Sequence, residues 1–139
     1  MKLEVINHGY KILPTRSHMH DAGLDLYSPE AVTLKPGETK NINLKIGFKI
    51  PAGHMGVLHN RSGHSSNGLR VSNSPIDTGY TGPVHAIVTN TSNEDFVIDE
   101  DMKVCQLVVI PIVICDLVTE EEVQKEAPRG TNGFSSTGK

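Results

Sequence analysis

The sequence predicts a single all-β domain, a barrel or a jelly roll, and three observations support that fold class. The chain has 139 residues, which is the size of one compact domain, and 37% of them are hydrophobic. Apolar residues recur at every second position within Lys40–Ile50, which is the period of a half-buried β-strand. Thirteen glycines and eight prolines divide the chain into short segments, as in antiparallel β-proteins.

Strands are predicted wherever a short apolar segment lies between turn residues. Lys40–Ile50 is the clearest, because every even position from Ile42 onward is apolar and Pro36-Gly37 precedes it. The other predicted strands are Leu3–Ile6, Ala31–Leu34, Gly56–His59, Val84–Thr89, Phe96–Ile98 and Val104–Val113.

One short helix is predicted to start at Thr119. Thr119 and Glu122 have the spacing of a capping box, and acidic residues fill the first turn, where the helix dipole favours them. The helix is expected to end before Pro128.

Composition and charge exclude some partners. No apolar run approaches the ~20 residues of a membrane span, and the start of the chain lacks the pattern of a secretory signal, so a cytoplasmic protein is expected. The net charge is −3 with scattered Lys and Arg, which argues against nucleic-acid binding but allows a nucleotide ligand shared with Mg²⁺. Cys105 and Cys115 accompany an apolar stretch and are expected to be buried, reduced thiols.

Four internal segments and the tail carry side chains suited to nucleotide chemistry, although each is weak evidence alone. Gln106 interrupts an apolar run, and on a strand its side chain faces away from Cys105 and Leu107. The segments, in order, are those around Asp25, Arg61-Ser62-Gly63, Asn73 to Tyr80 with Ile76 and Asp77, Gln106, and the tail from Arg129 to Lys139.

The tail differs in composition from the rest of the chain. Arg129, glycine amides and hydroxyl groups are suited to wrapping a phosphate chain, and Phe134 can stack on a flat base. The tail cannot bury much apolar area, so it is expected to be mobile when free. The expected organisation is therefore a domain of residues 1–128 and a flexible C-terminal arm of residues 129–139, with an ordinary frayed terminus as the alternative.

Taken together and in order, these segments closely resemble the five motifs of the trimeric dUTP pyrophosphatase (dUTPase) family, phage-type members included. The resemblance extends over residues 21–138. It implies a distorted jelly-roll-like β-barrel with one short helix, assembling as a homotrimer with shared active sites. It also implies an enzyme that uses Mg²⁺ to hydrolyse dUTP to dUMP and pyrophosphate, in the host cytoplasm if the gene is viral.

The resemblance also assigns roles to matching positions. Asp77 is expected to be the general base that activates water for attack on the α-phosphate. Asp25 is expected to hold Mg²⁺ through water. Ile76 and Tyr80 match the floor beneath the deoxyribose, and Asn73 matches the segment that reads the uracil edge.

The remaining assigned residues concern the phosphates and the closing arm. The resemblance gives phosphate contacts to Arg61, Ser62, Gly63 and Gln106. It assigns arm closure to a further set, with Arg129 on the terminal phosphate and Phe134 over uracil: Arg129, Phe134, Ser136 and Thr137.

Some positions depart from the family pattern. Asn60 stands where a proline is usual, so the phosphate turn is expected to be less rigid. The hairpin from Asn73 to Asp77 is shorter than usual and has Pro75 in place of a glycine, which puts the uracil contacts in question. Asn132 and Ser135 replace glycines in the tail, so weaker arm closure is expected.

Two other functions remain open on the sequence. A dCTP deaminase-like enzyme would need a further acid/base, and no Glu lies between Arg61 and Tyr80. A nucleotide-dependent, protein-binding regulatory trimer, with a partner that the sequence does not identify, is the alternative from a different class.

Overall fold

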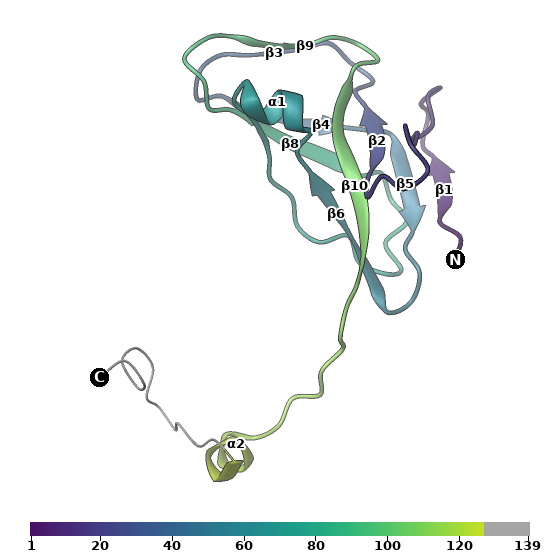
Figure 1. Ribbon diagram of the computed structural model, residues 1–139, viewed down its shortest axis with the longest axis vertical. Helices are drawn as coiled ribbons and strands as arrows, with labels where there is room; N and C mark the ends of the chain where they lie inside the picture. Colours follow the sequence, from purple (N-terminus) through teal and green to yellow (C-terminus); the bar gives the residue numbers. More distant parts are fainter. Residues whose placement is uncertain (127–139) are drawn as a thin grey trace.

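The structure, a computed structural model, describes residues 1–126. It is built mainly from ten short strands, which form four small antiparallel sheets around one core (Figure 1). The strands are β1 (Glu4–Asn7), β2 (Leu24–Tyr27), β3 (Val32–Leu34), β4 (Thr39–Asn43), β5 (Ile46–Lys49), β6 (His54–His59), β7 (Leu69–Val71), β8 (His85–Asn90), β9 (Phe96–Ile98) and β10 (Lys103–Pro111). The helices of the described residues are α1 (Ser62–Ser66) and α2 (Glu120–Glu126).

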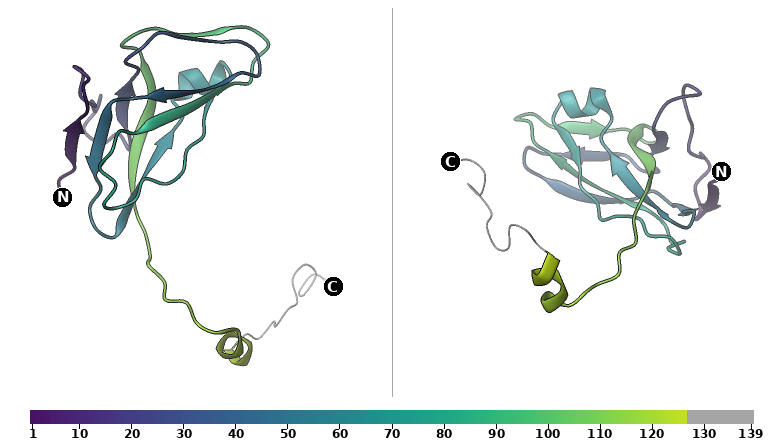
Figure 2. Two further views of the ribbon diagram at one scale, coloured as in Figure 1. Left: turned by 180° about the vertical axis from the view of Figure 1, so that it is seen from behind. Right: turned by 60° about the horizontal axis from the view of Figure 1, so that its bottom comes forward.

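Two three-stranded sheets provide most of the pairing. Strand β10 lies between β2 and β6, and β8 lies between β4 and β7, while β1 pairs with β5 and β3 with β9. Neighbours in each sheet are distant in sequence, and every pairing is antiparallel. The views from behind and from below show the sheets closing around each other into a barrel (Figure 2). The predicted all-β, jelly-roll-like fold is confirmed.

The alternation within Lys40–Ile50 correctly predicts which side chains enter the core. Its even-numbered apolar residues are all at most 3% exposed. The prediction of one continuous strand is wrong, because the segment forms β4 and β5, which pair with different sheets. The break comes at Lys45, whose φ of 55° is left-handed and whose N–H donates to Asn43 Oδ1 at 2.8 Å.

Three short elements differ from the prediction. Strands β2 and β7 were not predicted, since runs of three or four residues are too short to show a period. The segment after Arg61 forms helix α1, which was not predicted, so residues 1–126 contain a second short helix beside the predicted one. The predicted helix is confirmed as α2, where the N–H of Glu122 donates to Thr119 Oγ1.

After β10 the chain runs away from the barrel as an extended segment that leads to α2 (Figure 1). Its apolar side chains are exposed, at 84% for Val113, 79% for Ile114 and 98% for Leu117. Cys115 in this segment is exposed as well, contrary to the expectation of a buried thiol. Cys105 is buried as expected, and burial raises the pKa of its thiol to about 12.

No helix among residues 1–126 has the length and apolar character needed to cross a membrane. The predicted boundary between residues 128 and 129 and the whole predicted arm lie outside the described residues. The division into domain and arm therefore stays a prediction.

Candidate functional site

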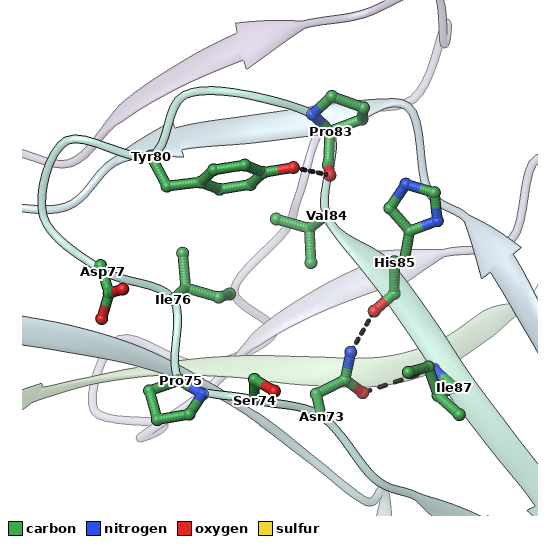
Figure 3. Close-up of a pocket in the computed structure, with 10 residues that line it drawn as sticks. All are labelled: Asn73, Ser74, Pro75, Ile76, Asp77, Tyr80, Pro83, Val84, His85 and Ile87. Atoms are coloured by element: carbon green, nitrogen blue, oxygen red, sulfur yellow. Dashed lines mark hydrogen bonds between the residues drawn. The ribbon is translucent and has the colours of Figure 1, made fainter.

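A pocket of about 280 Å³ lies between the loop that follows β7 and the first part of β8 (Figure 3). It contains four of the residues predicted to bind or hydrolyse a nucleotide, which are close in sequence. Its lining consists of Asn73, Ser74, Pro75, Ile76, Asp77, Tyr80, Pro83, Val84, His85 and Ile87.

Ile76 fixes the loop against the barrel. Its N–H and C=O both pair with Gly56 of β6, at 2.8 and 2.9 Å, and its side chain is buried. The next residue, Asp77, is exposed, so its carboxylate is at the rim of the pocket. The C=O of Asp77 accepts from the N–H of Tyr80 at 3.1 Å, and Gly79 takes the φ of +96° that this turn requires. Asp77 and Tyr80 are thus held on one tight turn.

Tyr80 forms the facing side of the pocket. Its hydroxyl donates to the Pro83 carbonyl at 2.9 Å, which extends the ring across the pocket above Ile76 (Figure 3). The ring is half-exposed, and Gly82 beside it has no room for a Cβ, which would lie 2.7 Å from the Tyr80 hydroxyl oxygen. The result is a flat apolar slot with a carboxylate at its edge.

Asn73 is tied to β8. Its side-chain amide donates to the carbonyl of His85, and its Oδ1 accepts from the N–H of Ile87 at 3.4 Å (Figure 3). His85 and Ile87 also line the pocket, and the sequence analysis did not select them. The alternation along Val84–Thr89 was a signal for them, because odd positions of that strand face away from the core.

A second group of predicted residues gathers around Asp25 on β2. Arg61 Nε lies 3.2 Å and Lys103 Nζ 3.3 Å from its carboxylate oxygens, and Ser17 Oγ donates to it at 3.2 Å. Burial alone would raise the pKa of the Asp25 carboxyl. The hydrogen bond from Lys103 and the charge of Arg61 outweigh burial and hold this pKa below its ordinary value.

Gln106 lies beside this group, facing away from the buried Cys105 and Leu107 as the strand alternation predicts. Its Nε2 donates to the carbonyl of Asn60 at 2.9 Å. The side chain of Asn60 accepts from the N–H of Val71 at 2.6 Å. The turn that lacks the family's usual proline is therefore hydrogen-bonded through both the main chain and the side chain of Asn60.

Arg61 stands at the N-cap of α1, and Ser62 and Gly63 form its exposed first residues. Lys103, which pairs with Asp25 together with Arg61, was given no role in the sequence analysis. No local pattern reveals it, because the contact depends on how β10 is aligned with β2.

Within one chain the two groups are separate. Ile76 pairs with Gly56 on β6, whereas Gln106 lies opposite His59, three residues further along that strand, or ~10 Å. The pocket has none of the predicted phosphate-binding residues in its lining. Over residues 1–126, no three His, Cys, Asp or Glu side chains gather as a metal cage. The predicted arm residues Arg129, Phe134, Ser136 and Thr137 lie outside the described residues.

The arrangement offers an apolar slot with a carboxylate at its rim, and a cluster of cations and amides suited to phosphate oxygens. The model of the dUTPase family matches residues 9–138. A deoxyuridine 5'-triphosphate nucleotidohydrolase of Clostridium novyi is 41% identical over 131 residues, which are 91% of each chain. A Corynebacterium diphtheriae protein of the same name is 36% identical over 91% of this chain and 85% of its own.

Solved structures of phage dUTPases are similar as well. The dUTPase of Staphylococcus bacteriophage 80alpha with dUPNHPP has a TM-score of 0.85 and 29% identity, over 99% of each chain. A dUTPase from phage phi11 of S. aureus has a TM-score of 0.81 and 30% identity, over 87% of this chain and 97% of its own. A mutant of the phi11 enzyme coordinates a structural Mg(II) ion.

Proposed function

Since this chain belongs to the dUTPase family, we propose that it hydrolyses dUTP to dUMP and pyrophosphate by attack of water on the α-phosphate. The observation that carries the proposal is the exposed carboxylate of Asp77 at the rim of a slot with the apolar residues Ile76 and Tyr80. A nucleoside in this slot has its sugar against the two side chains and its α-phosphate near the carboxylate. Such hydrolysis yields dUMP and places the enzyme in nucleotide metabolism.

Asp77 is proposed as the general base. A displacement at phosphorus needs a nucleophile that is held in line, and a carboxylate within hydrogen-bond reach orients a water molecule and takes its proton. The turn from Asp77 to Tyr80 and the pairing of Ile76 with Gly56 fix the main chain of Asp77, which places its carboxylate at the rim of the slot. Tyr80 beneath the sugar leaves little space for a ribose 2′-hydroxyl.

Arg61, Ser62, Gly63 and Gln106 are proposed as phosphate ligands. Two cations, Arg61 and Lys103, surround one carboxylate, that of Asp25, so the group carries a net positive charge. Arginine and amide N–H groups are suited to the oxygens of a triphosphate, and such contacts stabilise the negative charge that spreads in the transition state.

Magnesium is proposed as the metal. Mg²⁺ prefers oxygen ligands and keeps several waters, so phosphate oxygens and a carboxylate reached through water suffice, which fits the lack of a metal cage in residues 1–126. Asp25 is the residue proposed to hold it, because its carboxylate lies next to the proposed phosphate-binding residues and accepts hydrogen bonds from Ser17 and Arg61. When bound, the ion supplies neutralisation of phosphate charge.

A homotrimer with shared active sites is proposed. The separation of the Asp77 pocket from the Arg61 group within one chain supports a site that takes these groups from two subunits. The exposed apolar residues Val113, Ile114 and Leu117 support self-association, because burying them against another copy is favourable. The arm residues Arg129, Phe134, Ser136 and Thr137 are proposed to close over the nucleotide from a third subunit.

Base recognition is proposed for Asn73 together with the backbone of β8. The amide of Asn73 is hydrogen-bonded to the backbone of His85 and Ile87, so this side chain lies beside the part of β8 that would face the uracil edge.

The phage 80alpha dUTPase that is similar in structure is described as controlling transfer of virulence genes, and that description concerns the phage protein alone. A regulatory protein partner and a cytoplasmic location stay predictions for this chain, which we do not expect to bind membranes or nucleic acids.

The test is a substrate panel. The purified protein with Mg²⁺ is offered dUTP, UTP, dTTP and dCTP while pyrophosphate release is followed. We expect release from dUTP at a kcat/KM about 10² or more above each of the others, as polar discrimination in a shaped site allows. Absence of release from dUTP contradicts the proposal, and ammonia from dCTP would show a deaminase instead.

A further inference from the structure

Helix α1 carries the proposed phosphate-binding turn, yet it contributes little to its own placement. It has five residues, none of them buried, and no side chain caps its N-terminus. A single helical turn is unstable in isolation, because nucleation costs more than one turn of hydrogen bonds returns. The positions of Arg61, Ser62 and Gly63 therefore depend on contacts between α1 and the barrel.

His64 provides such a contact from the middle of α1. Its Nε2 lies 2.7 Å from the main-chain carbonyl oxygen of Lys103 on β10, which only accepts, so Nε2 carries the proton and donates. The same ring meets Phe96 edge to face, with centroids 5.7 Å apart and an interplanar angle of 86°. Half-buried between these neighbours, His64 joins α1 to a strand far away in sequence.

Lys103, whose carbonyl accepts the hydrogen bond from His64, also belongs to the cluster of charged residues around Asp25. The pairing of β10 with β2 shifts register between Lys103 and Cys105, an irregularity of the kind that re-aims backbone and side-chain groups. The Lys103 ammonium pairs with Asp25, and Asp25 pairs with Arg61 at the start of α1. Two connections thus join the turn to Lys103, one through the Asp25 carboxylate and one through the His64 ring.

These two connections respond differently to a nucleotide. Arg61 contacts Asp25 through Nε, and phosphate oxygens compete with the Asp25 carboxylate for the same guanidinium, so the ionic connection is open to competition from the ligand. The bond from His64 to Lys103 uses neither a phosphate ligand nor a charge that phosphate attracts. It therefore persists in the complex, when the turn most needs a fixed position.

We propose that His64 is a positioning residue for triphosphate binding, which holds the Arg61-Ser62-Gly63 turn in register with Gln106 and Asp25 through the carbonyl of Lys103. This inference rests on the proposed function. Other contacts of the segment hold its two ends, through Asn60 before α1 and through the bond from Arg70 to Ser65. Among all these contacts, the one made by His64 joins the middle of α1 directly to the main chain of β10.

The test compares His64→Leu, which removes the donor, with His64→Gln, whose Nε2 can reach the same carbonyl. His20→Leu, which removes an exposed histidine that belongs to neither α1 nor β10, is the matched control. Calorimetry with Mg²⁺ measures the Kd of a non-hydrolysable imido analogue of dUTP and that of dUMP, and steady-state assays give KM and kcat for dUTP.

For His64→Leu we expect the Kd of the analogue and the KM for dUTP to rise about tenfold, since small misplacements in a binding constellation have large effects. The Kd of dUMP, which has one phosphate instead of three, should change less than about threefold. His64→Gln should restore most of the affinity for the analogue, and His20→Leu should resemble the wild type.

Unchanged affinity of His64→Leu for the analogue would overturn the inference, as would an equal loss for dUMP or a failure of His64→Gln to recover. If His64→Leu does not fold, the comparison moves to His64→Gln against His64→Asn, whose amide is too short to reach the carbonyl. Equal affinities of that pair would also overturn it. A wild-type protein that binds no analogue contradicts the proposed function instead.

Discussion

Gly23 matters to the proposed phosphate site through the space that it leaves. A Cβ at this position would overlap the side-chain amide oxygen of Gln106, and it would lie 2.9 Å from Cδ of the same residue. Gly23→Ala should therefore displace the amide and raise the KM for dUTP about tenfold, with little change in Tm. Steady-state kinetics and thermal unfolding provide the measurement.

A double-mutant cycle with Gln106→Ala separates this effect from general damage. If Gly23→Ala acts through Gln106, the double variant has the same KM as Gln106→Ala alone. Additive losses would show that Gly23 acts by another route.

Asp101 links two segments of the barrel by its charge. It accepts from the Tyr10 hydroxyl at 2.7 Å and pairs with Lys11 Nζ at 3.0 Å. The hydrogen bonds from Tyr10 and Lys11 lower the pKa of this carboxyl below its ordinary value of 3.8. The folded state therefore binds the proton less readily than the unfolded chain, and the stabilisation is complete above the ordinary pKa and lost as the pH falls through the lowered one.

Asp101→Asn tests this dependence, because Asn tolerates the φ of 64° at this position. We expect a lower Tm than that of the wild type at pH 7 and a difference that shrinks below about pH 4. Thermal unfolding followed by circular dichroism at several pH values measures it. A difference that stays constant with pH would mean that the charge of Asp101 contributes nothing.

At the scale of elements, the break between β4 and β5 lets one apolar run form strands in two different sheets. Lys45 takes the left-handed conformation there, which costs an L-residue roughly 1–2 kcal/mol. Lys45→Gly removes that cost but adds backbone entropy to the unfolded chain, so we expect a net gain of roughly 0.5 kcal/mol. Urea unfolding measures it, and a loss of stability would contradict the importance of this φ.

The inward faces of the strands are predictable from the sequence where the alternation is long, as from Ile42 to Ile50. The break at Lys45 is not, because burial on the inner face continues through it and only the pairing partner changes. Strands β2 and β7 escape prediction for a related reason. Each is held by pairing with a long partner strand, and neither has a period of its own.

The candidate site likewise contains some residues that the sequence reveals and others that only the fold brings together. Residues of the Asp77 turn are contiguous, so a motif finds them together. The partners of Asp25 and of the α1 helix, Lys103 above all, come from strand register and sequence-distant contacts. The register between two strands cannot be read from a motif within one of them, so these partners were not predictable from the sequence.

At the scale of the whole molecule, the separation of the pocket from the Arg61 group has a direct consequence for mixed assemblies. Asp77→Asn and Arg61→Ala should each be nearly inactive alone. In mixed trimers, some sites take an intact Asp77 from one subunit and an intact Arg61 from the next. Equal random mixing should restore about one quarter of the wild-type activity, by counting such sites in a cyclic trimer.

The measurement is dUTP turnover after the two variants are unfolded together and refolded, with each variant refolded alone as the control. Recovery would require subunits that share sites. Persistent inactivity of mixtures that do form trimers would contradict shared sites. It would mean that each active site takes Asp77 and Arg61 from the same chain.

The central claim is that Asp77 activates water for attack on the α-phosphate of dUTP. Turnover of dUTP with Mg²⁺ in ¹⁸O-water, followed by mass spectrometry of both products, tests it most directly. We predict the label in dUMP and not in pyrophosphate, and a turnover about 10²–10⁴-fold lower for Asp77→Asn with its affinity for the dUTP analogue retained. Label in pyrophosphate, or an Asp77→Asn variant as fast as the wild type, would contradict the account.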